Sequence, residues 1–328
     1  MTPVQHPLAY IPSPPVNGFH IGPLFVHYYG LMYVIGITLA ILITQRRIRS
    51  SGGDASVVGD IALWAVPAGI IGGRIYFDIT TPADIPHVWY GPFAVWSGGL
   101  GIWGGVAAGA LVGVWRVKRR GLAVAPFADA VAPALLVAQA VGRIGNYFNQ
   151  ELFGKPTTLP WALFIDPRYR PAGYKGFHTF QPTFLYELIF DLALAALLVW
   201  LGHHTRVRPP GLFALYVTGY SAFRIFEESL RIDSSEHFLG LRLNFYVAAA
   251  LTLAGIAWFV IIQRRKPAAA SDDAGGPTPD DKAGEAAPSD ASGSAIGEAS
   301  VDAPADTGAD GAEGDHQGTV PDKTGRRA

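Results

Sequence analysis

The sequence contains no cysteine among its 328 residues, and only 16% of its residues are charged. The absence of cysteine excludes disulfides, thiolate metal sites and a cysteine nucleophile supplied by this chain. The low charge content accompanies 50% hydrophobic residues and a mean hydropathy of +0.25. This composition is typical of a membrane protein rather than of a soluble domain of this size.

The formal net charge of -1 averages two unlike parts of the chain. Residues 267–328 contain 13 acidic and 4 basic side chains, whereas residues 1–266 contain 13 acidic and 21 basic side chains. The C-terminal part has almost no large apolar residues, so burial cannot offset the entropy of ordering it. We expect residues 1–266 to form a membrane domain and residues 267–328 to form a disordered acidic tail, either simply solvated or binding a partner.

Seven segments are apolar enough, and at roughly 20 residues long enough, to cross the hydrocarbon core as helices. The sequence therefore predicts an all-α integral membrane protein built as a bundle of about seven transmembrane helices. The predicted spans are residues 24–45, 57–78, 95–116, 126–147, 183–201, 211–230 and 244–263.

Basic residues cluster after the first, third, fifth and seventh predicted spans, which places all four clusters on one side. Because cytoplasmic loops are rich in Lys and Arg, we predict that this side is cytoplasmic, with the N-terminus outside and the tail inside. The first 23 residues carry no Lys or Arg, unlike a cleavable signal peptide, so we expect the first span to be retained. Residues 148–182 are expected to form a small extracytoplasmic cap.

Glycine recurs every fourth residue in two predicted spans. This spacing lines one helix face with residues that let another backbone approach closely, so we interpret these glycines as packing positions. Room for a lipid chain is the functional alternative for some of them. The positions are Gly69 and Gly73 in the second span and Gly101, Gly105, Gly109 and Gly113 in the third.

Ionisable side chains lie within or at the ends of several spans, where a central arginine costs about 2.5–3.5 kcal/mol on insertion scales. An internal ion pair would explain any one of these residues taken alone. Because they all lie at a similar depth in their spans, we favour a polar cavity that opens to the outer leaflet. Arginine suits a phosphate in such a cavity, because a guanidinium stays charged and contacts two oxygens. The set is Arg74, Asp78, Arg143, Glu151, Glu187, Asp191, Arg224, Glu227, Glu228 and Arg231.

The end of the fourth span reads GRIGNYFNQELFG over residues 142–154. This segment resembles the signature of the prolipoprotein diacylglyceryl transferases, in which a Gly-Arg-x-Gly-Asn core is followed by Asn, Glu and Gly. The matching positions are Gly142, Arg143, Gly145, Asn146, Asn149, Glu151 and Gly154.

Other segments also resemble motifs of this family, and the resemblance covers about residues 20–265. They are HYYGLMY at 27–33, GGRIYFD at 72–78, QPTFLYE at 181–187 and GYSAFRIFEESLR at 219–231. One position departs from the family pattern. Trp103 stands where better-studied members have a histidine proposed as a catalytic base, so no base role is carried over to it.

The resemblance implies an enzyme of the bacterial cytoplasmic (inner) membrane that performs the first step of lipoprotein maturation. Members transfer the diacylglyceryl group of phosphatidylglycerol to the thiol of the lipobox cysteine in a prolipoprotein signal peptide. A thioether forms and glycerol phosphate leaves, and the substrate supplies the nucleophile. The implied partners are phosphatidylglycerol, the prolipoprotein signal peptide and membrane lipid, with no nucleic acid, and neither a cofactor nor a metal is expected.

This chemistry assigns roles to the matching residues. Arg143 and Arg224 would stabilise the charge that grows on the phosphate. A thiol has a pKa of about 8.5 and nearby arginines favour its thiolate, so a strong base is not required. His27 and Glu151 are candidate bases, although His27 also fits a helix-end histidine and Tyr29 an interface anchor. The predicted catalytic residues are Arg143, Arg224, Tyr29, His27 and Glu151, and the predicted substrate-binding residues are Arg143, Asn146, Asn149, Gly154, Tyr220, Glu228 and Arg231.

Three other protein classes are alternatives. An anionic-solute transporter or channel would also use buried arginines, but the charges lie toward one side and no repeated half with broken helices is evident. An intramembrane protease would need a Ser–His pair or paired aspartates, and Ser97 and Ser221 have no evident histidine partner. The concentration of arginine and carboxylate in the outer halves argues against a purely structural scaffold.

Overall fold

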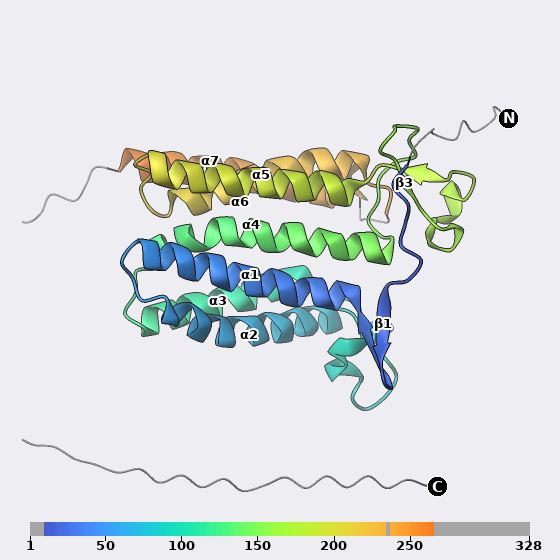
Figure 1. Cartoon of the computed structure of the whole chain (residues 1–328), viewed down its shortest axis with the longest axis horizontal. Coiled ribbons are helices and arrows are strands. Elements are labelled where there is room, and N and C mark those ends of the chain that lie inside the picture. Colours follow the sequence, from blue (N-terminus) through green and yellow to red (C-terminus); the bar gives the residue numbers. More distant parts are fainter. Residues whose placement is uncertain (1–9, 234–236, 266–328) are drawn as a thin grey trace, which may run out of the picture. The chain divides into compact units, whose positions relative to one another are not determined.

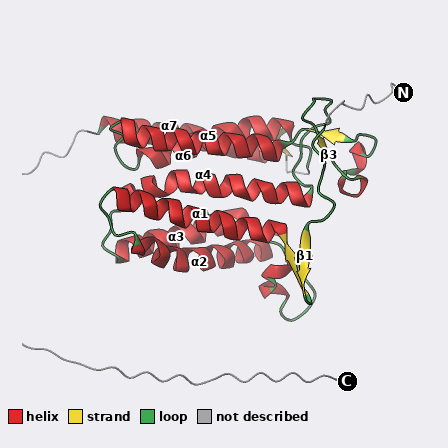
Figure 2. Cartoon of the chain, viewed as in Figure 1, coloured by secondary structure: helices red, strands yellow, loops and turns green. Residues whose placement is uncertain are grey.

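Seven antiparallel helices form the body of the described chain, with short strands gathered at one end (Figures 1 and 2). The computed structural model describes residues 10–233 and 237–265. The helices are α1 (Tyr28–Ser50), α2 (Ser56–Thr80), α3 (Ile102–Arg119), α4 (Val124–Asn149), α5 (Thr183–His204), α6 (Gly211–Leu230) and α7 (Leu243–Arg264). The predicted disordered tail at 267–328 lies outside the described residues.

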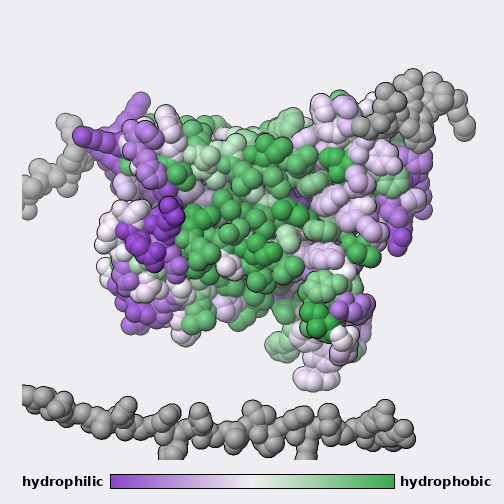
Figure 3. Space-filling model, in the orientation of Figure 1, coloured by the Kyte–Doolittle hydropathy of each residue, from purple (hydrophilic) through white to green (hydrophobic). Residues whose placement is uncertain are grey.

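Five of these helices, α1, α2, α4, α5 and α7, are long and apolar enough to cross a membrane. The other two are shorter, at 18 residues for α3 and 20 for α6, so a span-length stretch of either includes its three charges. These are Arg116, Lys118 and Arg119 in α3 and Arg224, Glu227 and Glu228 in α6. Figure 3 shows an apolar surface across the middle of the helices and hydrophilic residues at both ends. The predicted all-α, multi-pass membrane protein is therefore confirmed.

Two helices begin later than hydropathy predicts. The first begins at Tyr28 because β2 (Leu24–His27) pairs with β1 (Gly18–Ile21) in a hairpin. The third begins at Ile102 because the backbone turns at Gly98 and Gly99, whose φ values of 87° and 78° favour glycine. In both cases a local backbone turn, which average hydropathy does not report, sets the boundary.

The glycines of α2 and α3 bring the two backbones into contact. A Cβ atom on Gly72 would lie 2.6 Å from the Gly104 carbonyl oxygen, and one on Gly104 would lie 2.3 Å from the Gly72 oxygen. The Gly101 amide also donates to the Gly73 carbonyl at 2.8 Å. Of the predicted positions, Gly69 and Gly105 would place a Cβ atom 3.4 and 3.3 Å from each other's carbonyl oxygen, which agrees with the packing interpretation. Gly72 and Gly104 are not among the predicted positions, although their backbones approach most closely.

The segment between α4 and α5 folds over the end of the bundle. Its strands β3 (Leu163–Phe164) and β4 (Thr179–Phe180) pair antiparallel, and Phe153, Leu163, Ile165 and Phe180 form a small buried core. Ile11 exchanges backbone hydrogen bonds with this segment, at 2.8 Å to Ala162 and 2.9 Å from Phe164. The N-terminal segment therefore fastens the segment 150–182, hereafter the cap, to the start of α1.

Two further contacts fix the cap above α6. Gly154 forms a β-bridge with Arg231, and the Lys155 amide donates to the Leu230 carbonyl at 2.8 Å. The cap thus stands over the ends of α4 and α6 and over the start of α5.

Candidate active site

Two arginines from different helices meet on one buried carboxylate. Glu187, in the second turn of α5, is 0% exposed. Arg143 from α4 places Nη2 2.7 Å from Glu187 Oε1, and Arg224 from α6 places Nη1 3.3 Å from Oε2. The Tyr220 hydroxyl donates to Oε1 at 2.9 Å. A buried charge is tolerated when it is paired and hydrogen-bonded in this way.

Both arginine side chains keep some exposure. The side chain of Arg143 is 20% exposed and that of Arg224 is 18% exposed, so neither is fully buried. Each guanidinium has five N–H donors, and the contacts to Glu187 use only part of them. The pair therefore retains capacity for a further anion.

Arg224 also contacts two carboxylates on its own helix, those of Glu227 and Glu228. Glu228 in turn accepts from Arg242 and, at 3.2 Å, from Asn244 Nδ2. Residues three and four apart share a helix face, which explains the contacts within α6. Glu228 thereby links the C-terminal end of α6 to the start of α7.

A second chain of hydrogen bonds runs from Arg143 into the signature segment. Arg143 Nη1 donates to Asn146 Oδ1 at 3.1 Å, and Asn146 Nδ2 donates to Glu151 Oε1 at 2.8 Å. Asn149 Nδ2 approaches the same Glu151 oxygen at 3.3 Å. The signature residues thus connect the arginine pair to the exposed carboxylate of Glu151.

Gly145 allows α1 to lie against this part of α4. A Cβ atom there would lie 2.3 Å from Cδ2 of the Tyr29 ring. Tyr29 consequently packs directly on the signature helix, and its hydroxyl lies 3.0 Å from that of Tyr33.

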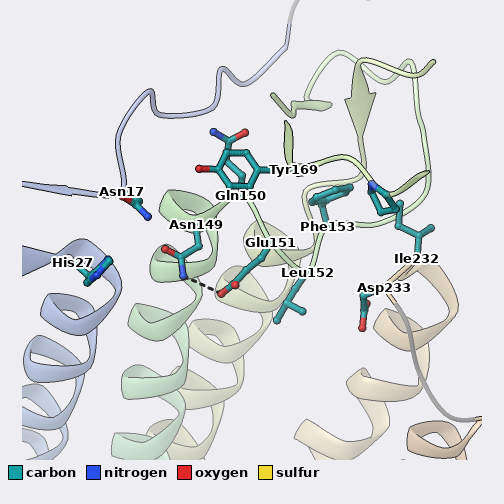
Figure 4. Close-up of a pocket in the computed structure, with 11 residues that line it drawn as sticks. Asn17, His27, Asn149, Gln150, Glu151, Leu152, Phe153, Tyr169, Ile232 and Asp233 are labelled. Carbon is teal, nitrogen blue, oxygen red and sulfur yellow. Dashed lines mark hydrogen bonds between the residues drawn. The ribbon is translucent and has the colours of Figure 1, made fainter. Parts of the chain in front are cut away.

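A pocket of about 490 Å³ opens beside Glu151. Figure 4 shows Asn149 reaching Glu151 between His27 and Asn17 on one side and Ile232 and Asp233 on the other. The lining comes from the N-terminal segment, the end of α4, the cap and the residues after α6. The lining residues are Asn17, His27, Asn149, Gln150, Glu151, Leu152, Phe153, Tyr169, Pro171, Ile232 and Asp233.

Asp233 is the charged group at the far edge of the pocket. Burial raises the pKa of its carboxyl, but hydrogen bonds and charge from Arg231 and Arg242 lower it more, so the pKa lies below its usual range. Arg231 Nε donates to Asp233 at 2.7 Å and Arg242 Nη2 at 3.0 Å. Arg231, Asp233 and Arg242 therefore form an ion-pair cluster between α6 and α7.

The predicted site residues divide into three groups. One group is connected by hydrogen bonds or ion pairs: Arg143, Asn146, Asn149, Glu151, Tyr220, Arg224 and Glu228. His27 and Tyr29 lie at the edge, where the exposed His27 ring packs edge-on against Phe25. Arg231 pairs with Asp233, whereas Gly154 is a packing position whose Cβ would lie 3.0 Å from the Leu230 carbonyl oxygen.

One pair of charges does not join this cluster, contrary to the expectation of a single shared cavity. Arg74 is buried and donates to the carbonyls of Gly91, Pro92 and Gly98 at 2.7, 2.9 and 2.6 Å. It also lies 3.1 Å from Asp78. This arginine holds the connection between α2 and α3 in place.

Sequence reasoning misses two members of the network, Arg242 and Asn244. It includes Glu187 and Glu227 among the charges of the expected polar cavity, but it does not identify Glu187 as the shared partner of the arginines. Arg242 and Asn244 carry no local signal, because only the fold of the α6–α7 connection brings them to Glu228. Within residues 10–233 and 237–265, no group of three or more His, Asp or Glu side chains is placed to hold a metal.

Asp191, one turn below Glu187, is fully buried, and neither of its oxygens has a hydrogen-bond partner among the described residues.

The charged groups of this network that pair with one another are equal in number. Arg143, Arg224, Arg231 and Arg242 face Glu187, Glu227, Glu228 and Asp233. An incoming anion therefore meets arginines already held in place by carboxylates.

The comparisons with known proteins agree with the signature. A model of the family described as prolipoprotein diacylglyceryl transferase matches residues 17–261. The relative named phosphatidylglycerol–prolipoprotein diacylglyceryl transferase from Frankia alni is 47% identical over 261 residues, covering 78% of this chain and 68% of the relative. A protein of that name numbered 2 in Streptomyces coelicolor is 43% identical, with 79% and 83% covered.

A third relative of the same name, from Bifidobacterium adolescentis, is 45% identical over 272 residues, and the match covers 78% of this chain and 81% of the relative. The matched region includes all seven helices of the described residues except the last residues of α7. The chain therefore belongs to the prolipoprotein diacylglyceryl transferase family.

Proposed function

We propose that this chain transfers the diacylglyceryl group of phosphatidylglycerol to the thiol of the lipobox cysteine of prolipoproteins. The product is a thioether, glycerol phosphate is released, and the reaction is the first step of bacterial lipoprotein maturation. The observation that carries the proposal is the convergence of Arg143 and Arg224 on Glu187, with both arginine side chains still partly exposed.

The reaction balances without an oxidant or cofactor. The sulfur forms a bond to the glycerol carbon that bears the phosphate, and the carbon–oxygen bond breaks. Its electron pair stays on the phosphate oxygen, and the thiol proton leaves with the glycerol phosphate or passes to water. Negative charge therefore grows on the phosphate, which is where fixed cations lower the barrier most.

Arg143 and Arg224 are the groups we assign to that charge. Glu187 holds them on different oxygens of one carboxylate, so the two cations are fixed close together before a phosphate binds. Tyr220 supports Glu187 from the same helix as Arg224. The positive charges also favour the substrate thiolate, which is the reactive form.

Asn146, Asn149 and Glu151 are the groups we assign to the glycerol hydroxyls of the headgroup. Their amides and carboxylate form one connected set, and Asn149 and Glu151 line the pocket. His27 and Tyr29 border this region and complete the substrate environment. Glu228 acts by holding Arg224, while Arg231 and Gly154 shape the pocket edge and the cap contact.

We further propose a place and an orientation for the protein, namely the bacterial inner membrane with the cap and N-terminus extracytoplasmic and the tail cytoplasmic. The basic residues gathered at the helix ends opposite the cap support this orientation. They are Arg46, Arg47, Arg49, Arg116, Lys118, Arg119, Arg120, Arg206, Arg208, Arg264 and Arg265.

The test is transfer by the purified protein in vesicles that contain phosphatidylglycerol and a lipobox peptide. Mass spectrometry should detect one diacylglyceryl group on the peptide cysteine and glycerol phosphate in solution. Vesicles of phosphatidylethanolamine and a Cys→Ser peptide are the controls, and both should give no product. Flux of an anionic solute without peptide modification would instead support the transporter alternative.

A further inference from the structure

Gln150 follows the last residue of α4 and separates two residues of the proposed headgroup site, Asn149 and Glu151. Its φ of 52° lies in the left-handed region, which is uncommon for residues other than glycine. Its side chain is buried, at 6% exposure, although its neighbour Glu151 is exposed. A buried amide in a strained backbone conformation requires strong local contacts to hold it.

Those contacts come from two other parts of the chain. Gln150 Nε2 donates to the Pro14 carbonyl at 3.1 Å, and Gln150 Oε1 accepts from the Asp166 amide at 2.8 Å. One end of the amide thus binds the N-terminal segment and the other binds the cap. The side chain is a bridge between three segments that meet only in the folded protein.

The bridge fixes the direction of the chain at Glu151. After the left-handed residue, the Glu151 amide donates to the Asn146 carbonyl at 3.2 Å, and its carboxylate accepts from the Asn146 side chain. Leu152 is also left-handed, with φ of 57°, and its carbonyl accepts from the Thr183 hydroxyl. Figure 4 shows Gln150 beside Tyr169 of the cap, while Asn149 and Glu151 meet lower in the pocket.

We propose that Gln150 is a positioning residue that orients the Glu151 carboxylate for the headgroup of phosphatidylglycerol. This inference rests on the proposed function. It assigns catalytic influence to a side chain whose amide is engaged by Pro14 and Asp166, because that amide determines where the adjacent carboxylate points.

The informative substitution is Gln150→Gly. Glycine adopts the left-handed conformation without strain, so this variant removes the bridge and leaves the backbone conformation accessible. We expect kcat/KM for phosphatidylglycerol to fall about tenfold. In a Glu151→Gln background the same change should cost less than about twofold, because the group that Gln150 orients has already been altered.

If Glu151→Gln has too little turnover to measure, the same double-mutant cycle can be built from binding. The quantity measured is then the dissociation constant of dihexanoyl-phosphatidylglycerol in detergent for each of the four proteins.

Leu239→Gly is the matched control. Leu239 is also left-handed, with φ of 46°, but it is 82% exposed in the turn between β5 (His237–Phe238) and β6 (Leu241–Arg242), so its activity should equal that of the unaltered protein.

Unchanged activity and lipid binding in Gln150→Gly, or equal losses in both backgrounds, would overturn the positioning role and leave a purely structural bridge. If the unaltered protein binds the short-chain lipid but transfers nothing, the proposed function fails, and the cycle of dissociation constants still decides the role of Gln150. If it binds no phosphatidylglycerol, both proposals fail.

Discussion

Arg143 and Arg224 contact different oxygens of the same carboxylate, Oε1 and Oε2 of Glu187, at 2.7 and 3.3 Å. Two like charges from separate helices are thus held close together by one counter-ion. The arrangement sets the spacing of the cations before any phosphate arrives, and preorganised charge of this kind is what accelerates charge-forming reactions.

Removal of the Glu187 charge should damage both stability and activity. Glu187→Gln leaves two neighbouring arginines with one fewer counter-ion, and breaking a buried ion pair costs about 3–5 kcal/mol. We expect a lower melting temperature in detergent and loss of transfer. Asp166→Asn, at an exposed pair with Arg168, is the control and should melt normally. A normal melting temperature for Glu187→Gln would contradict the shared-anchor role.

Arg143→Ala should lower transfer by about 10²–10³-fold, the effect of removing one preorganised electrostatic group. Arg143→Lys keeps the charge but loses the planar fork, so it should recover only part of the rate. Arg168→Ala, whose side chain is 70% exposed, provides a control arginine with normal activity. Vesicle assays matched for protein content would separate lost transfer from lost protein, and full activity in Arg143→Ala would refute the phosphate role.

Arg74→Met should loosen the connection between α2 and α3. The substitution leaves four backbone carbonyls without this donor, and each unsatisfied buried acceptor costs about 1–3 kcal/mol. We expect faster proteolysis within residues 85–101 and a lower melting temperature. Arg119→Met, at the other end of α3, is the control and should leave the rate of proteolysis unchanged. An unchanged rate in Arg74→Met would show that other contacts hold the loop.

Asp233 should make the α6–α7 connection sensitive to acid. A carboxyl whose pKa is lowered in the folded state stabilises that state above its unfolded pKa of about 3.9, and the contribution disappears as the pH falls through the folded pKa. Asp233→Asn should therefore be less stable than the unaltered protein at pH 7, with the difference shrinking below about pH 4. Thermal melts across this range measure it, and a constant difference would rule out the ion pair as its source.

Much of the fold is predictable from the sequence, because apolar length determines which segments cross the membrane. All seven predicted spans correspond to helices of the described residues. The boundaries at Tyr28 and Ile102 are not predictable in this way, since they depend on a β-hairpin and on two glycines with positive φ.

The candidate site is predictable to a lesser degree. The signature and the depth of the charges identify Arg143 and Arg224, and the expectation that side chains of separate helices meet is confirmed for these two. That Glu187 joins them, and that Arg242 closes over Glu228, depends on the packing of α4 to α7. Arg74 illustrates the opposite error, because its depth resembles that of the site arginines while its partners are backbone carbonyls.

The contact between Gly72 and Gly104 also bears on how the protein is assembled. The two helices are consecutive in the chain, and at these glycines their backbones come into direct contact. Such a hairpin can associate as soon as its second helix has entered the bilayer, before α4 is synthesised. The α2–α3 hairpin is therefore expected to form as a separate unit during biogenesis, before the later helices pack onto α1 and α4.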